Sequence, residues 1–592
     1  MKPGLGILLL FPFFCLSGQS STPDWARDAI WYQIFPERFR NGDVKNDPTK
    51  EELEFPAARE WHSSPWTSDW YQLQPWEARF NPDFYHNVLD RRYGGDLQGV
   101  IDKLDYLSSL GINAIYFNPV FEAYSLHKYD ASYYHHIDKN FGPDAAGDRK
   151  LMELEDDNPA TWHWTAADSL FLKLIRAAHA RHIRIIIDGV FNHSGTRSFA
   201  FRDVVKNQRR SRYAEWYDIR QWDDPATPAN EFRYKGWWDE PTLPEFREDA
   251  NGFSPAVKQY FFNVTKRWMD PNGDGDPGDG IDGWRLDVAN DVSHVFWKEW
   301  RKVVKRINPD AYLVAELWDD AQEWLRGDEF DATMNYPFAR ASVQYFINTG
   351  SMKTTATQFA AALAAARARY PDEANFVLQN LLDSHDTDRL LSMIANPNRR
   401  YNSDNGLRGN ARYFPGKPGE EARRTMKLMT LFQMTYLGAP MIYYGDEAGM
   451  WGANDPDERK PMVWSDLTYE RETTHPLPGG PPPNDNVEFD KNLFSWYQQL
   501  IAVRNANVAL RRGSFAVLKA DDANDVLVFQ RVVAGNRVIV AINNSKDKRI
   551  VELNAEGNFT DALDGTHFIA TRGAVKLPLL PVSGRILVTG NK

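Results

Sequence analysis

The sequence predicts an α/β fold: a (β/α)8 barrel with a small domain inserted after the third strand and a C-terminal antiparallel β-sandwich. Short β-rich runs alternate with helical stretches over most of the chain. Several of these runs are continuously apolar, as expected of parallel strands buried on both faces. From about Gly513 onward, short runs instead alternate apolar and polar residues with turn residues between them, which is typical of antiparallel strands.

Eight candidate strands account for the barrel. They are residues 29–34, 114–118, 184–188, 283–286, 312–316, 332–335, 375–382 and 441–444. Helical stretches lie between most of them, such as residues 97–110 and 169–181, and residues 494–504 follow the last strand. Residues 97–110 place apolar side chains at the spacing of an amphipathic helix.

The spacing of the strands locates the inserted domain. Residues 189–282 separate the third strand from the fourth, a far longer stretch than one helix and two loops need. We therefore assign the chain as a sequence of five segments. They are a signal peptide (1–22), the first part of the barrel (23–193), an inserted domain (194–252), the second part of the barrel (253–510) and the β-sandwich (511–592).

The first 22 residues resemble a secretory signal. Lys2 precedes an apolar run over residues 5–16, and small polar residues follow it. The run is too short for an ordinary membrane span. Cys15, the only cysteine, lies inside it, and its neighbours fit a lipoprotein cleavage box poorly. We expect an exported protein, periplasmic or extracellular, with no lipid anchor at Cys15 and no disulfide.

Composition excludes several classes of protein. The 592 residues are 42% hydrophobic and 25% charged, which rules out a disordered chain, a collagen and a coiled coil. The formal charge, 69 − 81 = −12, repels phosphate backbones, so we expect no nucleic-acid partner. Aromatic residues make up 14% of the chain, which suits either a large core or platforms that stack on sugar rings.

Four of the candidate strands end in polar clusters that each contain a carboxylate: Asp188, Asp287, Glu316 and Asp386. Asp287 and Glu316 are 29 residues apart, about one strand–helix unit, and Glu316 and Asp386 are 70 apart, which fits two units. Because catalytic residues of such barrels lie at the carboxyl ends of strands, these acids should line one mouth of the barrel.

A single aspartate at a strand end is as often a helix N-cap as a functional residue. Several such acids with Arg or His beside them favour chemistry, because glycoside cleavage needs two carboxylates that flank the bond. Arg285 lies two residues before Asp287, so it should point to the same side of the strand and keep Asp287 ionised.

These clusters resemble the signature regions of family 13 of the glycoside hydrolases, the α-amylase family, over about Trp31 to Trp464. Four segments are similar to its neopullulanase, cyclomaltodextrinase and maltogenic amylase branch. They are 282–290 (DGWRLDVAN), 324–328 (WLRGD), 334–338 (MNYPF) and 126–130 (LHKYD). The resemblance implies a retaining hydrolase that cleaves α-1,4-glucosidic bonds in starch-derived glucans, maltodextrins, pullulan or cyclodextrins through a covalent glycosyl-enzyme.

The resemblance also implies the role of each residue. Asp287 would be the nucleophile, Glu316 the general acid/base and Asp386 a third carboxylate that binds sugar hydroxyls. The residues that would hold the sugar are Asp188, His193, Arg285 and His385, with Tyr129 stacking beneath it and His127 nearby. Two alternatives remain: a 4-α-glucanotransferase that uses the same intermediate, and, less favoured because all three acids are present, a non-catalytic glucan-binding scaffold.

Several positions depart from the branch. Asp291 replaces the usual Glu, a position that can influence transfer against hydrolysis, and residues 243–246 (LPEF) replace Met-Pro-Lys-Leu. Branch members usually carry an N-terminal β-domain that supports dimerisation and narrows the cleft, whereas here the barrel pattern starts directly after the signal. We therefore expect a monomer that accepts open-chain glucans. Residues 51–89 could replace the missing wall with the aromatic faces of Trp61, Trp66, Trp70, Tyr71 and Trp76, or these could pack the segment onto the barrel.

Two loops are candidate Ca²⁺ sites, because hard oxygen ligands on a tight loop suit this ion. Residues 41–47 (NGDVKND) could equally be a polar turn, but related enzymes bind Ca²⁺ with such a loop plus a Gly-Gly-Asp turn. The resemblance thus implies the ligands Asn41, Asp43, Asn46, Asp47, Gly94 and Asp96. Residues 270–281 place acids as an EF-hand does but lack its final Glu. Either a turn or a second Ca²⁺ at Asp270, Asn272, Asp274 and Asp276 fits them.

Overall fold

The computed structural model describes residues 22–53 and 60–589. The predicted signal and Cys15 therefore lie outside the described residues, apart from Thr22. Among the described residues, no helix combines the length and the apolar character that a membrane crossing requires.

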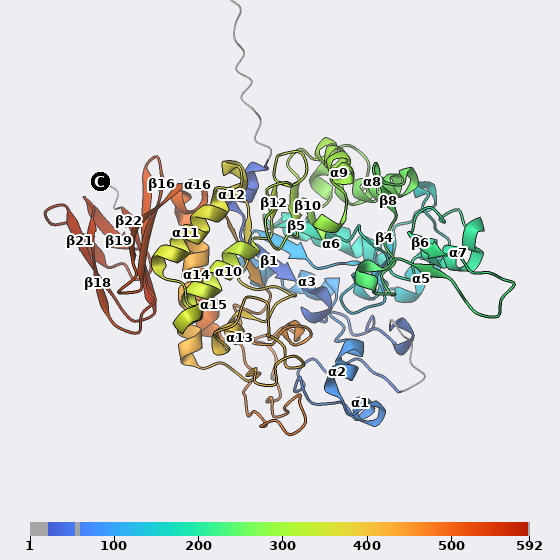
Figure 1. Ribbon diagram of the computed structural model, residues 1–592, viewed down its shortest axis with the longest axis horizontal. Coiled ribbons are helices and arrows are strands. Elements are labelled where there is room, and N and C mark those ends of the chain that lie inside the picture. The colour runs from blue at the N-terminus through green and yellow to red at the C-terminus, as the bar shows by residue number, and fades with distance from the viewer. Residues whose placement is uncertain (1–21, 54–59, 590–592) are drawn as a thin grey trace, which may run out of the picture.

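Eight parallel strands form the predicted barrel (Figure 1). In the sheet they follow the order β12-β11-β10-β5-β2-β1-β14-β13, and a parallel bridge between Met334 and Gln379 joins the two outer strands. The strands are β1 (Trp31–Ile34), β2 (Ala114–Phe117), β5 (Arg184–Gly189), β10 (Gly283–Leu286), β11 (Tyr312–Ala315), β12 (Ala332–Thr333), β13 (Gln379–Asn380) and β14 (Ala439–Tyr443).

Each of the eight predicted strands overlaps one of these, but the seventh is shorter than expected. Only Gln379–Asn380 of residues 375–382 pair as a strand, and residues 372–375 form the short helix α12 (Asp372–Asn375). The strand is short because Leu381 and the residues after it leave the ladder to form the loop that carries Asp386.

Helices surround the sheet in the order that the sequence predicts, with two exceptions. The helix expected over residues 97–110 divides at Lys103 (φ −104°, ψ 6°) into α3 (Leu97–Asp102) and α4 (Leu104–Leu110). No helix lies between β11 and β12, over residues 316–331. The other helices of the barrel are α6 (Ala166–His179), α8 (Pro255–Met269), α9 (His294–Ile307), α10 (Tyr336–Phe346), α11 (Ala356–Arg367), α13 (Leu390–Ala395), α14 (Glu420–Thr435) and α15 (Lys491–Ala506).

The long connection after β5 forms a layer of short elements at one end of the molecule (Figure 1). They are α7 (Phe199–Asn207), the hairpin β6 (Ile219–Gln221) with β7 (Arg233–Tyr234), and the hairpin β8 (Glu248–Asp249) with β9 (Gly252–Phe253). The sequence did not predict a further hairpin, β3 (Phe121–Ala123) with β4 (Ala131–Ile137), which leaves the barrel after β2 and precedes α5 (Ala145–Met152).

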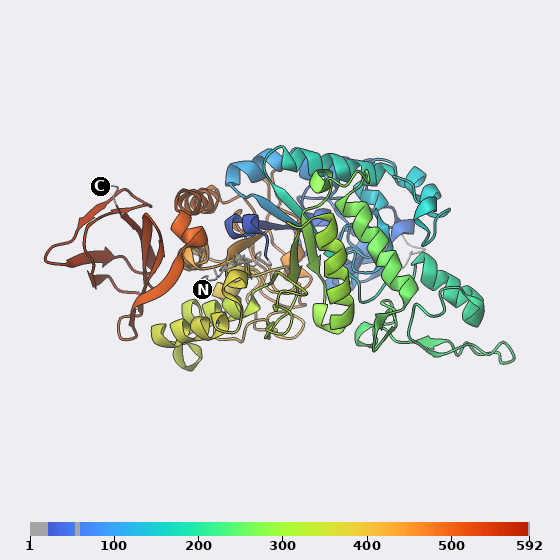
Figure 2. The same cartoon turned by 90° about the horizontal axis from the view of Figure 1, so that it is seen from above.

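The C-terminal residues form antiparallel sheets at the opposite end (Figure 2). A six-stranded sheet has the order β15-β16-β17-β22-β19-β20, and a two-stranded sheet pairs β18 with β21. The strands are β15 (Ser514–Asp521), β16 (Val526–Val533), β17 (Asn536–Asn543), β18 (Arg549–Asn554), β19 (Asn558–Asp561), β20 (His567–Ile569), β21 (Ala574–Leu579) and β22 (Ser583–Thr589). A separate apolar cluster, including Val528, Val551 and Leu577, fills the space between the two sheets.

Candidate active site

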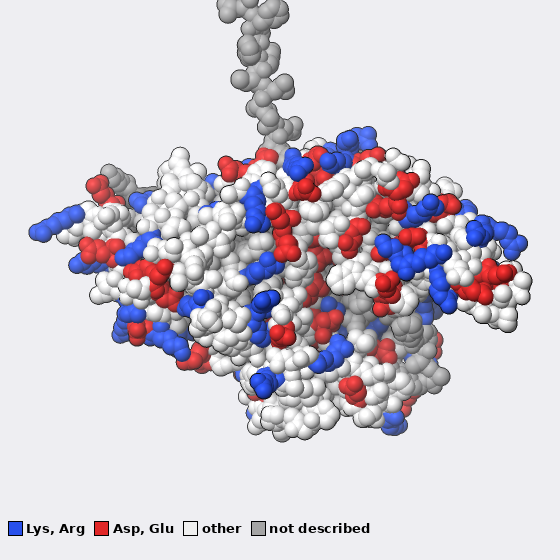
Figure 3. Space-filling model, in the orientation of Figure 1, with Lys and Arg blue, Asp and Glu red and all other residues white. Residues whose placement is uncertain are grey.

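Carboxylates from three neighbouring strand ends meet around one guanidinium. Arg285 Nη1 lies 2.9 Å from both carboxylate oxygens of Asp188 and 2.8 Å from Asp287 Oδ1. Arg285 Nη2 lies 3.0 Å from Glu316 Oε2. The four side chains converge because β5, β10 and β11 are consecutive in the sheet and bring these residues to the same edge. On the face shown in Figure 3, acidic side chains line a hollow near the middle of the molecule.

Burial, more than Arg285, controls the protonation of Asp287. The guanidinium beside Asp287 lowers the pKa of its carboxyl, as the sequence predicted. However, burial, with the carboxylates of Glu316 and Asp188, outweighs it and raises the pKa of Asp287 well above its usual value. Arg285 therefore acts on Asp287 in the predicted direction, but it is opposed by burial and by the neighbouring carboxylates. Burial likewise raises the pKa of Asp188 to about 6.

Glu316 is held on both of its carboxylate oxygens. The backbone N–H of Val288 donates to Oε2 at 3.0 Å, and Trp318 Nε1 donates to Oε1 at 3.1 Å. Val288 adopts a left-handed conformation (φ 38°, ψ 49°), which is rare for a β-branched residue and typical of strain stored at functional sites. Trp318 stacks on Tyr336 with ring centroids 3.8 Å apart. These contacts fix the orientation of the carboxyl.

Asp386 completes the group of acids from the loop after β13. His385 Nε2 lies 3.3 Å and Arg459 Nη2 3.7 Å from Asp386 Oδ1. Burial and the carboxylate of Glu316 raise the pKa of Asp386 to about 7. Burial and the charges of Arg459 and Arg285 hold the pKa of His385 well below its usual value, so this imidazole is neutral. We call Asp188, Asp287, Glu316 and Asp386 the carboxylate cluster.

The predicted sugar-binding residues surround this cluster. Tyr129 Oη lies 3.2 Å from Asp188 Oδ2 and 2.5 Å from His385 Nε2, and its ring is parallel to that of His385. His127 packs beside Tyr129, and burial lowers its pKa to about 3. Burial also lowers the pKa of His193 to about 4. The three histidines are therefore neutral at neutral pH and can each donate and accept hydrogen bonds.

The inserted segment contributes one wall. Trp237 stacks on His193, with ring centroids 5.6 Å apart, and its Nε1 donates to Asp291 Oδ2 at 2.8 Å. Trp238 beside it has a left-handed backbone (φ 52°, ψ 34°) and a side chain that is 84% exposed. A large apolar ring presented to solvent at the margin of the site is a candidate platform for a sugar ring.

Sequence reasoning missed four residues that contact the site: Tyr116, Trp237, Trp318 and Arg459. Tyr116 Oη donates to Asp188 Oδ2 at 2.7 Å, and Arg459 donates to the carbonyl oxygen of His385 at 2.8 Å. Tyr116 lies two residues before Asn118, whose Nδ2 donates to Tyr129 Oη at 3.3 Å. Because side chains alternate along a strand, this spacing could have placed the Tyr116 hydroxyl on the side of the site. Arg459 lies 73 residues after Asp386, so local spacing gave no signal for it.

In residues 51–89, the Trp-rich segment, three of the five predicted aromatic side chains are buried, whereas Trp66 and Trp76 are partly exposed. Trp61, Trp70 and Tyr71 are 8%, 3% and 2% exposed. Trp70 Nε1 donates to Asp457 Oδ1 at 3.0 Å. Asp457 lies two residues before Arg459, which contacts the site. Of the two alternatives, packing is therefore correct for these three side chains.

The two halves of the first predicted Ca²⁺ site converge. Backbone N–H groups of Gly42 and Asp43 donate to the Asp96 carboxylate at 3.1 and 2.8 Å. Asn41 Nδ2 donates to Asp47 Oδ1 at 2.6 Å. The loop thus folds over the start of α3 and gathers its oxygens beside the Gly94 turn.

Two features of this group fit a cation. The Oδ1 atoms of Asn41 and Asn46 are buried and have no hydrogen-bond partner among the described residues. Burial and neighbouring carboxylates raise the pKa of Asp47 to about 6, so negative charge here is unfavourable without a counter-ion. Gly94 (φ +73°) leaves no room for a side chain, because a Cβ would lie 2.1 Å from Asp47 Oδ1.

The second predicted Ca²⁺ loop forms a chain of tight turns. Its side-chain oxygens accept backbone N–H bonds from within the loop: Asn272 from Asp274, Asp274 from Asp276, and Asp270 from Gly275. These bonds fit the alternative of a polar turn, while the buried Asp270 Oδ1 has no hydrogen-bond partner in the described part of the chain. The second site stays a prediction.

Comparisons with known proteins agree with this architecture. The model of the α-amylase catalytic domain matches residues 33–156 and 165–513. Neopullulanase 2 of Thermoactinomyces vulgaris is 39% identical over 96% of this chain and 79% of its own length. A cyclomaltodextrinase of a Bacillus species is 37% identical over 91% of this chain and 76% of its own.

A solved structure gives the same result for the fold. The cyclic α-maltosyl-(1→6)-maltose hydrolase of Arthrobacter globiformis is 30% identical and superposes with a TM-score of 0.69 over 96% of this chain and 100% of its own. The chain therefore belongs to the α-amylase family, family 13 of the glycoside hydrolases.

Proposed function

We propose that this protein is a retaining α-glucan hydrolase that cleaves α-1,4-glucosidic bonds, with Asp287 as nucleophile and Glu316 as general acid/base. The observation that carries the proposal is the contact of both carboxylates with one guanidinium, at 2.8 and 3.0 Å from Arg285. Two carboxylates that share one guanidinium can flank one sugar bond, as nucleophile and acid/base must in the retaining mechanism.

In the first step, ionised Asp287 attacks the anomeric carbon while Glu316 gives its proton to the glycosidic oxygen. The carbon–oxygen bond breaks, the leaving sugar departs with that proton, and a covalent glycosyl-enzyme remains. Arg285 favours the ionised form of Asp287, and the Val288 N–H and Trp318 Nε1 keep the Glu316 carboxyl oriented toward the bond.

In the second step, Glu316 accepts a proton from water as the water oxygen attacks the same carbon. The bond to Asp287 breaks and the product keeps the original anomeric configuration. Neutral His127, His193 and His385 hold hydroxyl groups of the sugar without adding charge to the carboxylate cluster. Asp386 accepts hydrogen bonds from hydroxyls of the same sugar.

The substrate class follows from the relatives, which are named as acting on pullulan-type, cyclic or maltosyl glucans. We infer that starch-derived oligosaccharides, pullulan and cyclodextrins are the glucans to test. Glucan transfer is the second candidate activity, because Asp291, which replaces the usual Glu, is held by Trp237 at the margin of the site. Product analysis with starch, pullulan and β-cyclodextrin separates hydrolysis from transfer.

Asp287→Asn and Glu316→Gln should each remove most glucan cleavage while leaving the fold intact. Loss of the acid/base alone removes roughly 10²–10⁴-fold of the rate, and loss of the nucleophile should cost at least as much. Asp319→Asn is the matched control, because this carboxylate follows Trp318 but is 82% exposed. Steady-state kinetics on maltoheptaose measures the effect, and a fluoro-sugar trap should label Asp287. Labelling of another residue would contradict the assignment.

The proposal includes one Ca²⁺ held by the loop 41–47 together with Gly94 and Asp96. The buried amide oxygens of Asn41 and Asn46 and the carboxylates of Asp43, Asp47 and Asp96 are the hard oxygen ligands that this ion prefers. Its role is structural, because the loop joins the end of β1 to the start of α3.

Export after cleavage near residue 22 is also part of the proposal, and the mass of the mature N-terminus in secreted material tests it.

A further inference from the structure

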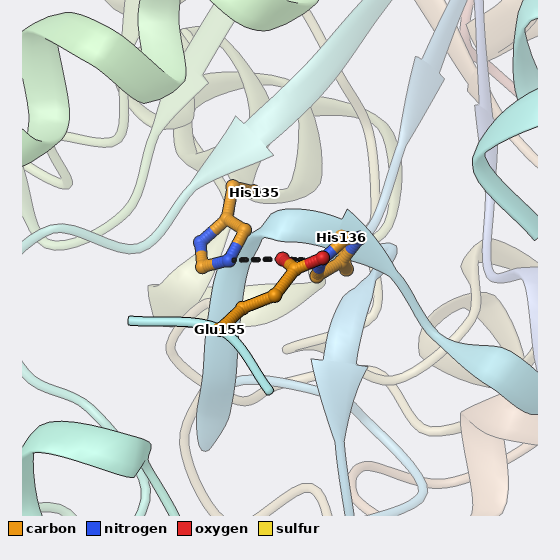
Figure 4. Close-up of side chains that lie close together, drawn as sticks. All are labelled: His135, His136 and Glu155. Carbon is orange, nitrogen blue, oxygen red and sulfur yellow. Dashed lines mark hydrogen bonds and ion pairs between the residues drawn. The ribbon is translucent and has the colours of Figure 1, made fainter. Parts of the chain in front are cut away.

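A buried cluster outside the active site resembles a metal centre. His135 and His136, on β4, and Glu155, in the connection between α5 and α6, have side chains that are 0% exposed (Figure 4). Glu155 Oε2 lies 3.2 Å from His135 Nε2 and 2.6 Å from His136 Nε2. One ligand atom from each of the three residues lies within 4.8 Å of the others.

Both histidines face the same carboxylate because β4 is irregular. Neighbouring residues of a regular strand point to opposite faces. The pairing of β3 with β4 shifts register twice, and the rings of His135 and His136 are only 4.5 Å apart. Such irregularities re-aim side chains and are common next to functional sites.

Partners on the far side of each ring fix its orientation. His136 Nδ1 donates to Asp168 Oδ2 at 2.8 Å, and His135 Nδ1 lies 2.9 Å from Tyr260 Oη. Metal-binding histidines are typically oriented in this way, with the second nitrogen held by a carboxylate or another polar group. In addition, His135 Nε2 is fully buried, points at Glu155 and makes no hydrogen bond of acceptable geometry with the described residues.

We propose that His135 Nε2, His136 Nε2 and the Glu155 carboxylate bind one Zn²⁺. Two imidazoles and one carboxylate are a common ligand set for zinc, with ligand bonds of about 2.0–2.2 Å. The 3.2 Å separation of His135 Nε2 from Glu155 Oε2 fits two ligands of one tetrahedral ion, and the His136 contact opens slightly to admit it. Ca²⁺ and Mg²⁺ are disfavoured because they require oxygen ligands.

The surroundings supply the rest of the centre. Glu155 Oε1 accepts hydrogen bonds from the His163 ring and backbone, and the His163 side chain is 54% exposed. His163 therefore lies between the buried cluster and solvent, on the side from which a water ligand would enter. Arg267 pairs with Asp168 at 2.9 Å, so this second carboxylate is already neutralised and serves to orient His136 instead of binding the ion.

The metal would join two segments that are separate in the fold. It links the hairpin β3–β4 to the α5–α6 connection, and Tyr134, beside His135, donates to the carbonyl oxygen of His193. The hairpin also includes Tyr129 and His127 in the segment between its strands. A zinc ion here is therefore a structural support for one side of the active site.

The test is a zinc titration of the full-length protein in excess Ca²⁺, after stripping with a chelator that prefers transition metals. Metal analysis should find about one Zn²⁺ per chain, and Co²⁺ should give the visible absorption of a tetrahedral centre. His135→Phe, which keeps the stack on Trp162, and Glu155→Gln, which keeps the shape, should both lose the stoichiometric ion. His294→Gln, which removes a half-exposed histidine paired with Glu329, should retain it.

The outcomes separate the proposal from its alternatives. Failure of the wild type to hold Zn²⁺ or Co²⁺ at stoichiometric level would show that the cluster is a hydrogen-bonded network only. Equal binding by the wild type and both cluster variants would place the ion elsewhere. Because the Co²⁺ spectrum is recorded on the wild type, misfolding of a variant does not remove the test. Bound zinc, lost in both variants and kept in His294→Gln, supports the centre.

Discussion

At the residue scale, the catalytic end of the barrel holds more negative groups than one cation can balance. Arg285 contacts Asp188, Asp287 and Glu316, while Asp386 is nearer to Arg459. Burial therefore raises the pKa of three of these four acids, which means that the folded state resists their ionisation. The site is destabilising at neutral pH, a common cost of an arrangement built for chemistry.

Asp386→Asn should therefore stabilise the protein at pH 8 while removing most activity. The folded-state pKa of Asp386 is raised from 3.8 to about 7. The protonated carboxyl is compatible with folding at low pH, and its ionisation destabilises the folded state increasingly as pH rises through 7. The gain at pH 8 should be about 1–2 kcal/mol, reduced from the full shift because the side chain is 28% exposed. Thermal unfolding at pH 5 and pH 8 measures it.

The gain should shrink toward pH 5, where wild-type Asp386 is already protonated in the folded state. Asp319→Asn, on an 82% exposed carboxylate, should change the melting temperature little at either pH. A variant that is less stable than the wild type at pH 8 would show that the contacts of Asp386 outweigh its burial.

Trp238→Ala should weaken the binding of long glucans. The ring is 84% exposed beside Trp237, and stacking on a sugar is worth about 0.5–1.5 kcal/mol, so the KM for maltoheptaose should rise roughly 2–10-fold with kcat little changed. Kinetics on maltoheptaose and maltotriose measure the effect. Ile550→Ala, which removes another exposed side chain on the C-terminal sheet, should change neither KM. Equal losses for both substrates would place Trp238 at the central subsite.

At the element scale, the loop 41–47 and the Gly94 turn are held together by backbone bonds to Asp96 and by tight contact at Gly94. Gly94 and Gly565 have nearly the same left-handed backbone, with φ of +73° and +74°. A side chain at Gly94 would collide with Asp47 and Asn41, whereas nothing lies within 4 Å of a Cβ at Gly565, in the turn between β19 and β20. The two positions therefore separate the cost of conformation from the cost of contact.

Gly565→Ala should cost only the left-handed conformation, about 1–2 kcal/mol. Gly94→Ala should cost more, because the Asp47 and Asn41 side chains must move, and it should also abolish the response to Ca²⁺. Excess EGTA should lower the melting temperature of the wild type and of Gly565→Ala but not that of Gly94→Ala. Thermal unfolding with parallel metal analysis measures this. An unchanged wild-type melting temperature after verified metal loss would contradict the Ca²⁺ site.

At the scale of the whole molecule, the C-terminal sheet is continuous with the barrel. Phe529 and Ile586 belong to the same apolar cluster as the barrel residues. Phe529 stacks on Phe515 and meets the edge of Phe432, on α14, at a centroid distance of 5.9 Å. Arg531 is fully buried here and donates to the carbonyl oxygens of Gly513 and Thr435. Sheet and barrel should therefore unfold together.

Calorimetry should accordingly show one unfolding transition, and Phe529→Ala should shift all of it to lower temperature. Truncation of a buried phenylalanine costs about 3–5 kcal/mol. Ile550→Ala, on β18, removes a side chain that is 76% exposed and should change stability by less than about 0.5 kcal/mol. Two separate transitions, of which Phe529→Ala shifts only one, would show that the C-terminal sheet is an independent unit.

Much of the fold and of the candidate site could be predicted because the signals are local. A buried parallel strand is an apolar run, and the residue that ends it is adjacent in sequence, so Asp188, Asp287 and Glu316 could be placed at one barrel mouth. The hairpin β3–β4 escaped prediction because its shifted register breaks the alternation of apolar and polar residues. The burial of the aromatic side chains in the Trp-rich segment could not be predicted, because the sequence pattern is the same whether such a ring packs or is exposed.

The sequence by itself determined the barrel, the order of its strands and the identity of the acids at their ends, because these depend on the periodicity of a few neighbouring residues. Only the tertiary structure decided which ionisable side chains from distant parts of the chain come into contact. Arg459 reaches Asp386 from 73 residues away, and His136 reaches Glu155 from 19 residues away, only after the barrel closes and its loops pack. Protonation and metal binding depend on such distances and on burial, and neither is encoded in local spacing.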